Sequence, residues 1–153
     1  MTSTTFADYA AAAEARKDIA AKVLAHSLEL CEALRTNFIN YSIKQHERSI
    51  DCADASDAGS IQYHEACIAK LEKGISDVDF TLDTGRKYHK IWHIDSGGSR
   101  SCHAFIDKKT GEVYKPASFK APAKIVRYNL LNIASREECF SRADWAGSYL
   151  YIR

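Results

Sequence analysis

The sequence lacks long apolar runs. No stretch approaches the roughly 18 to 20 consecutive apolar residues that a helix needs to cross a bilayer. The first residues also lack the basic segment followed by an apolar one that is typical of a secretory signal, and the acidic Asp8, Glu14 and Asp18 are atypical of a transit peptide. We therefore expect a cytoplasmic protein that neither spans a membrane nor binds to one.

Paired cysteines are missing as well. The five cysteines are odd in number, and no two of them form a CxxC pair. This pattern argues against a disulfide framework and against a zinc knuckle, and it favours free thiols in a reducing compartment. The five residues are Cys31, Cys52, Cys67, Cys102 and Cys139.

Proline and glycine are scarce, with 2 prolines and 7 glycines in 153 residues, and neither type occurs in the first 45 residues. In this stretch, apolar residues recur at helical spacing from Ile19 to Tyr41. The spacing predicts one long helix, continuous or broken near residues 36–40, with Thr4 or Thr5 as its N-cap. A second helix is predicted from Ser56 or Asp57 to Gly74, and the two helices are expected to form an antiparallel hairpin.

After Gly85 the pattern changes from a period of 3.6 to a period of 2, and aromatic and β-branched residues alternate between glycine-containing turns. The alternation predicts strands over residues 88–95, 100–107 and 112–117, joined by turns at residues 96–99 and 108–111. Three strands cannot cover both faces of their sheet, so the helices must cover one of them.

The last third of the chain predicts short elements. Pro122 fits the first turn of a short helix over residues 122–131, and Ser135 with Glu138 fits a capping box that opens a helix over residues 136–146. The tail, residues 149–152, is expected to add a fourth edge strand.

The predicted fold is therefore α+β: an N-terminal helical hairpin packed on a three- to four-stranded antiparallel meander, with short C-terminal helices. Leu, Ile, Val and Phe together number 32, which is enough for the core of one domain. We expect residues 1–153 to form that single domain, with a helical part over residues 1–80 and a sheet with short helices over residues 86–153.

Three histidines, His89, His93 and His103, lie within fifteen residues and close to Asp95 and Asp107. The group suggests a metal site or acid–base chemistry. However, two residues four apart in a strand are separated by about 13 Å, so His89 and His93 cannot bind one ion together. Hydrogen-bonded or solvated sheet histidines are therefore the favoured interpretation, and we expect no metal and no other cofactor.

The place of His103 depends on the turn before it. A four-residue turn would place His103 opposite Trp92 and Cys102 opposite His93, and a slip of one residue would pair His103 with His93. A cysteine opposite a histidine is what a thiolate nucleophile needs, but no third group or oxyanion donor accompanies it.

Two other motifs have ordinary interpretations. His64 and Cys67 have ligand-like spacing without a second pair of ligands. Residues 96–100 superficially resemble a phosphate-binding loop, but a strand follows them where such a loop needs a helix N-terminus.

Charge is unevenly distributed, although the net charge is only +1. Residues 1–85 carry a net charge of −6 and residues 86–127 a net charge of +7. In the basic segment, cations alternate with aromatic residues, as in sheets that stack the bases of single-stranded nucleic acids and neutralise their phosphates. If that function is correct, we expect the site residues to be Lys90, Trp92, Arg100, His103, Lys115 and Lys120. The alternative is that the basic sheet only complements the acidic helices.

Another class of function starts from the helices. An alanine-rich helix can approach a partner closely, and an acidic face on one molecule can meet a basic face on another. The sequence contains no paired carboxylates, no triad and no phosphate loop that would indicate an enzyme. We therefore expect a non-enzymatic accessory protein that binds another protein or itself, with single-stranded nucleic-acid binding as the alternative.

The stretch SRSCHAFID (residues 99–107), followed by TGEVYKPASFKAPA (residues 110–123), resembles small uncharacterised proteins of bacteriophages and marine metagenomes. Together with RYN (residues 127–129) and ADWAG (residues 143–147), the resemblance covers roughly residues 86–151. It implies a phage-like genome, and therefore the cytoplasm of an infected host cell. It supplies no catalytic residue.

Overall fold

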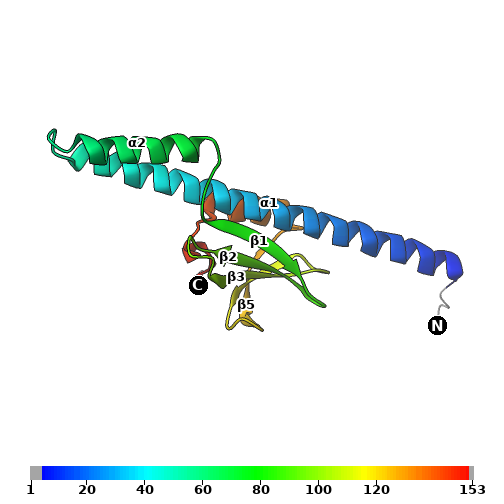
Figure 1. Ribbon diagram of the computed structural model, residues 1–153. Helices are drawn as coiled ribbons and strands as arrows, with labels where there is room; N and C mark the ends of the chain where they lie inside the picture. The colour runs from blue at the N-terminus through cyan, green and yellow to red at the C-terminus, as the bar shows by residue number, and fades with distance from the viewer. Residues whose placement is uncertain (1–4, 152–153) are drawn as a thin grey trace.

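The computed structural model describes residues 5–151 of the chain. In this part a long helix crosses one face of an antiparallel sheet, whose strand order is β1-β2-β3-β4-β5 (Figure 1). The elements are α1 (Phe6–Cys52), α2 (Ala58–Glu72), β1 (Asp79–Thr84), β2 (Tyr88–Ile94), β3 (Arg100–Asp107), β4 (Glu112–Pro116), β5 (Pro122–Asn129), α3 (Ile133–Arg142) and the 3₁₀-helix η1 (Ser148–Leu150). None of these helices is both long enough and apolar enough to cross a membrane.

Helix α1 is continuous over its 47 residues, so the break considered near residues 36–40 does not occur. Thr5 caps the helix: its side chain accepts a hydrogen bond from the Asp8 N–H, and the Asp8 side chain accepts one from the Thr5 N–H. The other candidate cap, Thr4, lies outside the described residues. The buried residues of α1 all lie between Val23 and Leu34, so only the middle of the helix packs on the sheet.

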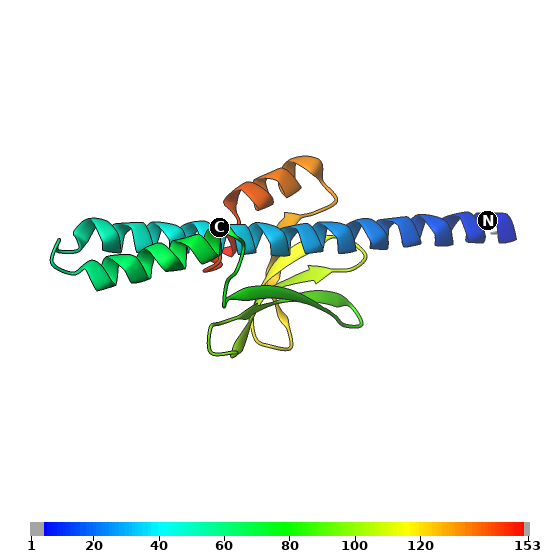
Figure 2. The same cartoon turned by 45° about the horizontal axis from the view of Figure 1, so that its top comes forward.

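The predicted helical hairpin does not cover the sheet. At 1.5 Å per residue, α1 is about 70 Å long and extends beyond the sheet at both ends. Helix α2 folds back along the C-terminal end of α1, away from the strands, while α3 lies beside the middle of α1 (Figure 2). The chain then turns at Gly74 (φ +80°) and enters the sheet at β1.

The sheet has five strands where three or four were predicted. The three central strands, β2 to β4, are confirmed to within one residue. The first strand, β1, was missed, although Phe80 and Leu82 alternate there with polar residues. The fifth strand, β5, was predicted as a helix because of Pro122. Proline is also tolerated at the first residue of an edge strand, and Pro122 begins β5 opposite Pro116.

The C-terminal segment also differs from its prediction. Helix α3 starts three residues early, because Asn132 caps it by accepting the Ser135 N–H at 3.0 Å. The hydroxyl of Ser135 instead accepts the Asn129 N–H at 2.8 Å, so Ser135 and Glu138 do not form the predicted capping box. Of the expected edge strand, Tyr149 and Leu150 belong to η1, and Ile152 lies outside the described residues.

Gly111 in the turn between β3 and β4 provides a test of this fold. Its φ is +74°, and a Cβ there would lie 3.0 Å from Leu131 Cγ and 3.2 Å from Leu131 N. Gly98 has a similar φ of +83° but open space around it. Both alanine variants incur the backbone strain of about 1 kcal/mol. We expect Gly111→Ala to lower the free energy of unfolding in urea by clearly more than Gly98→Ala, and equal losses would contradict the packing at Leu131.

Candidate functional site

Three of the six residues predicted to bind nucleic acid meet on the face of the sheet opposite α1. Lys90 Nζ lies 5.0 Å from the ring centroid of Trp92 and 5.1 Å from that of Phe105, and the Arg100 guanidinium lies 4.2 Å from Trp92. Phe119, from the loop between β4 and β5, covers Trp92 at 5.9 Å between ring centroids. We call these five residues the outer-face cluster.

Two rings of the outer-face cluster, those of Trp92 and Phe105, are buried. Lys90 donates a hydrogen bond to the carbonyl of Phe119 and so ties the covering loop to β2. Trp92 is 7% exposed and Phe105 is 1% exposed. Phe119 and the cationic side chains cover Trp92 and Phe105, so these two rings are not open for stacking, whereas the Phe119 ring is 59% exposed. Lys120, the residue after Phe119, is exposed in the same loop.

His103 and Lys115 lie elsewhere. A β-bulge interrupts the pairing of β2 with β3, so Trp92 pairs with Cys102 while Ile91 pairs with Ala104. His103 is the extra residue in the bulge, and its Nε2 lies 2.8 Å from the hydroxyl of Tyr149. Both predicted registers were therefore wrong, since His103 has no partner on β2.

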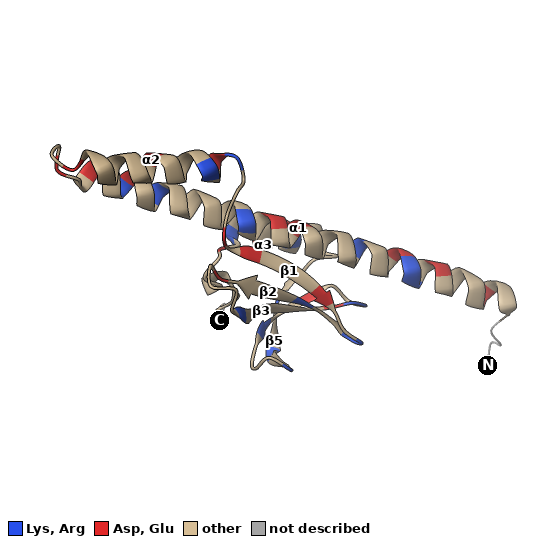
Figure 3. Ribbon diagram, in the orientation of Figure 1, with Lys and Arg blue, Asp and Glu red and all other residues tan. Residues whose placement is uncertain are grey.

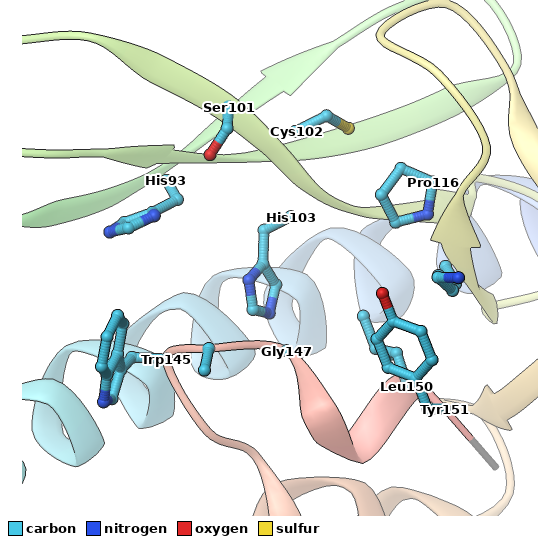
Figure 4. A pocket seen from close by; sticks show the side chains of 11 residues that line it. His93, Ser101, Cys102, His103, Pro116, Trp145, Gly147, Leu150 and Tyr151 are labelled. Carbon is cyan, nitrogen blue, oxygen red and sulfur yellow. The ribbon is translucent and has the colours of Figure 1, made fainter.

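His93, which pairs with Ser101 and not with Cys102, lines a pocket of about 330 Å³ on the α1 side of the sheet (Figure 4). His103 points into the middle of this pocket toward Gly147, and the ring of Trp145 stands near His93. At the other end Lys115 Nζ lies 4.0 Å from the ring centroid of Tyr151. The pocket thus combines aromatic walls with one cation.

The two histidines and the cysteine of this pocket favour their neutral forms. Burial, together with the nearby His93, lowers the pKa of His103 to about 4. Burial also lowers the pKa of His93 and raises the pKa of the Cys102 thiol to about 11. The Cys102 sulfur points away from both histidines (Figure 4). A thiol with so high a pKa and no imidazole beside it is not an activated nucleophile.

The remaining members of the histidine cluster are separated. His89 Nδ1 lies 2.9 Å from the Thr84 hydroxyl, and burial with the nearby Lys108 lowers the pKa of His89. Asp95 and Asp107 each accept backbone N–H groups of their own turns. Within residues 5–151, no group of three or more His, Cys, Asp or Glu side chains is arranged to hold a metal ion.

The structure also places the two other motifs, the segment at residues 96–100 and the pair His64 and Cys67. The segment at residues 96–99 is a hairpin turn, as predicted, with Gly98 in the left-handed region. On α2, the partner of His64 is a histidine of α1 and not Cys67. The Nδ1 atom of His64 lies 2.8 Å from Nδ1 of His46. A hydrogen bond to Cys67 is the main cause that raises the pKa of Tyr63.

A second cavity, of about 810 Å³, lies between the N-terminal half of α1 and two hairpin turns. Lys and Arg residues occur at the tips of these turns beneath α1 (Figure 3). We call this cavity the overhang groove. Its six cations come from three separate segments: Arg16 and Lys17 on α1, Arg86 and Lys87 before β2, and Lys108 and Lys109 after β3.

One acidic residue, Asp107, also lines the overhang groove, and its carboxylate is occupied by the N–H groups of Lys109 and Thr110. The sequence pattern did include the four cations of the turns. It missed Arg16 and Lys17, because only the path of α1 over the sheet brings them to the groove. Ala13 and Ala20 of α1 also line the groove and give it an apolar roof.

Comparison with known proteins gives a family and no function. Residues 6–152 match the model of a family described as a family of unknown function, DUF7717. The match includes the helical half that the resemblance to phage proteins left out. No curated protein and no solved structure matches the chain.

Burial of neutral His103 predicts sensitivity to acid. Between pH 6.5 and pH 4 the unfolded state binds a proton at this residue and the folded state does not, so stability falls as the pH falls through this window. The loss attributable to His103 is about 3 kcal/mol at pH 4. We expect urea unfolding measured from pH 7 to pH 4 to show this slope, and His103→Gln to flatten it. An unchanged slope in the variant would contradict the assignment.

Proposed function

We propose that this chain, which belongs to the DUF7717 family, is a non-enzymatic binding protein that holds the phosphate backbone of a nucleic acid in the overhang groove. The observation that carries the proposal is the convergence of six Lys and Arg side chains on one cavity whose single carboxylate is already hydrogen-bonded within its own turn. A cleft lined by charges of one sign attracts anions, and the attraction increases with the charge of the ligand.

Five of the six groove cations are exposed, and the sixth, Lys108, is half-buried and donates a hydrogen bond to the Gly85 carbonyl at 3.1 Å. Arg86, Lys87 and Lys109 are exposed. Lys17 has one acidic neighbour, Glu14, at 3.6 Å, and both side chains of this pair are about three-quarters exposed. An exposed pair of this kind contributes little energy, so it competes weakly with a phosphate. Each phosphate contact would release a condensed counterion, which supports salt-dependent binding.

The groove favours contacts to the backbone over contacts to bases. None of its lining residues in the described chain is aromatic, and the rings of Trp92 and Phe105 on the outer face of the sheet are buried. Cations without stacking rings hold phosphates but read little sequence. We therefore expect similar affinity for single strands of different sequence. The resemblance to phage proteins and the five free cysteines support a role in the cytoplasm of an infected host cell.

The test is a pair of charge reversals at the groove. We expect Lys87→Glu combined with Lys109→Glu to weaken binding of labelled mixed-sequence single-stranded DNA and RNA strongly and uniformly across sequences, measured by fluorescence anisotropy at low and moderate salt. Loss of two phosphate contacts lowers the slope of log K against log salt by about 1.4.

The matched control is Lys115→Glu combined with Lys120→Glu, which makes the same change of charge at two cations outside the groove. Binding by this control is expected to fall only slightly, through the change in net charge. Stronger loss in the control than in the groove variant would move the site to the residues predicted from sequence. Absence of binding by the unmodified protein at low salt would overturn the proposal.

Self-assembly is the second candidate, because α1 exposes apolar side chains that nothing in the described chain covers. Phe6 is 85% exposed, Tyr9 61%, Leu24 41% and Leu28 49%. Alanines between them would allow the α1 helix of a second copy to approach closely. Such exposed apolar groups mark contact surfaces when they are contiguous.

Light scattering coupled to gel filtration tests this candidate. We expect a dimer or larger species for the unmodified chain and a monomer for Leu24→Gln combined with Leu28→Gln. Ile125→Gln removes a side chain that is 68% exposed on β5 and should leave the mass unchanged. A monomeric unmodified chain at high concentration would exclude self-assembly and leave the nucleic-acid proposal untouched.

A further inference from the structure

A pair of histidines joins α1 to α2 at the end of the molecule that lies beyond the sheet. His46 Nδ1 on α1 and His64 Nδ1 on α2 are 2.8 Å apart, and the ring centroids are 5.1 Å apart at an interplanar angle of 49°. Both residues are half-buried, so water and small ions reach the pair from one side. In the metal-free chain one Nδ1–H donates to the other Nδ1.

The surroundings of this pair are apolar. One turn before and one turn after each histidine stands an isoleucine, and all four isoleucines are half-buried: Ile43, Ile50, Ile61 and Ile68. An apolar seam of this kind packs two helices without polar groups. The two imidazoles lie between these isoleucines along the two helices, with the Tyr63 ring 5.2 Å from that of His64, and their Nδ1 atoms face one another.

We propose that His46 and His64 together bind a divalent transition-metal ion of the zinc class. Imidazole nitrogen suits Zn²⁺, Ni²⁺ and Cu²⁺, whereas Mg²⁺ and Ca²⁺ require oxygen ligands. Two nitrogens at about 2.0 to 2.1 Å from a tetrahedral ion are roughly 3.3 Å apart, so the pair has to open by only about half an ångström. The hydrogen-bonding proton moves from Nδ1 to Nε2 of the same ring, and both rings turn so that their Nδ1 lone pairs face the metal.

Water would complete the coordination sphere. Cys67 lies one turn after His64, but no group of three or more His, Cys, Asp or Glu side chains among the described residues is arranged to hold a metal ion. Because its two ligands come from different helices, the ion would tie α2 to the end of α1. This site is distant in sequence and in the fold from the overhang groove, and the two proposals stand or fall separately.

Calorimetric titration of the full chain with Zn²⁺ tests the site, with Mg²⁺ as the inert ion. We expect one Zn²⁺ ion to bind per chain and Mg²⁺ to give no heat of binding. Zn²⁺ should raise the melting temperature of the protein, and Mg²⁺ should not. Combined His46→Leu and His64→Leu substitutions should abolish zinc binding while preserving helicity by circular dichroism, because replacing both partners of a hydrogen bond by apolar groups is nearly neutral in such a seam.

Two single variants serve as controls. His26→Ala removes another imidazole of α1, one that lies 3.2 Å from Glu29, and should bind Zn²⁺ as the unmodified chain does. Cys67→Ser should do the same. Zinc binding that survives in the double leucine variant, that disappears in Cys67→Ser, or that is absent from the unmodified chain would overturn the assignment.

Discussion

The packing of the middle of α1 on the sheet is the interaction on which the rest of the structure depends. Val23, Leu30 and Leu34 are fully buried and share one core with Phe80 and Ile91 of the strands. Each such side chain contributes about 1.5 to 3 kcal/mol through burial. At the end of this contact Arg35 donates to the Asp79 carboxylate at 2.5 Å and to the Phe80 carbonyl at 2.6 Å, which ties the helix to the start of β1.

Both candidate binding regions follow from this one contact. Because only the middle of α1 is anchored, its N-terminal half projects over the hairpin turns and roofs the overhang groove, while its C-terminal end carries α2 and the histidine pair. A helix that ended with the sheet would form neither. The sheet, in turn, places Arg86 and Lys87 beside Lys108 and Lys109, because the turns between β1 and β2 and between β3 and β4 lie at the same end of an antiparallel meander.

The outer face of the sheet meets a different constraint. Aromatic residues lie on the face of the sheet away from α1, and no helix within residues 5–151 covers that face. The loop after β4 covers it instead, with Phe119 on Trp92 and Lys90 bonded to the loop backbone. Cations and rings that alternate along a sequence can therefore satisfy one another within the fold. This is why Trp92 and Phe105 are buried and not available for stacking.

The elements with strong local signals could be predicted from the residues alone. The absence of glycine and proline before residue 59 and the Thr5 cap define α1, and alternation between glycine turns defines β2, β3 and β4. Weaker local signals failed: Pro122 fits a helix start and a strand start equally well, and its strand is decided by pairing with β4. Three features depend on contacts between distant parts of the chain: the bulge at His103, the burial of Trp92 and Phe105 on the outer face, and the approach of Arg16 to turns that lie 70 or more residues further on. The periodicity of a helix or strand is encoded by residues that are close in sequence. Strand register and the proximity of distant segments depend instead on which surfaces become buried against one another in the folded chain.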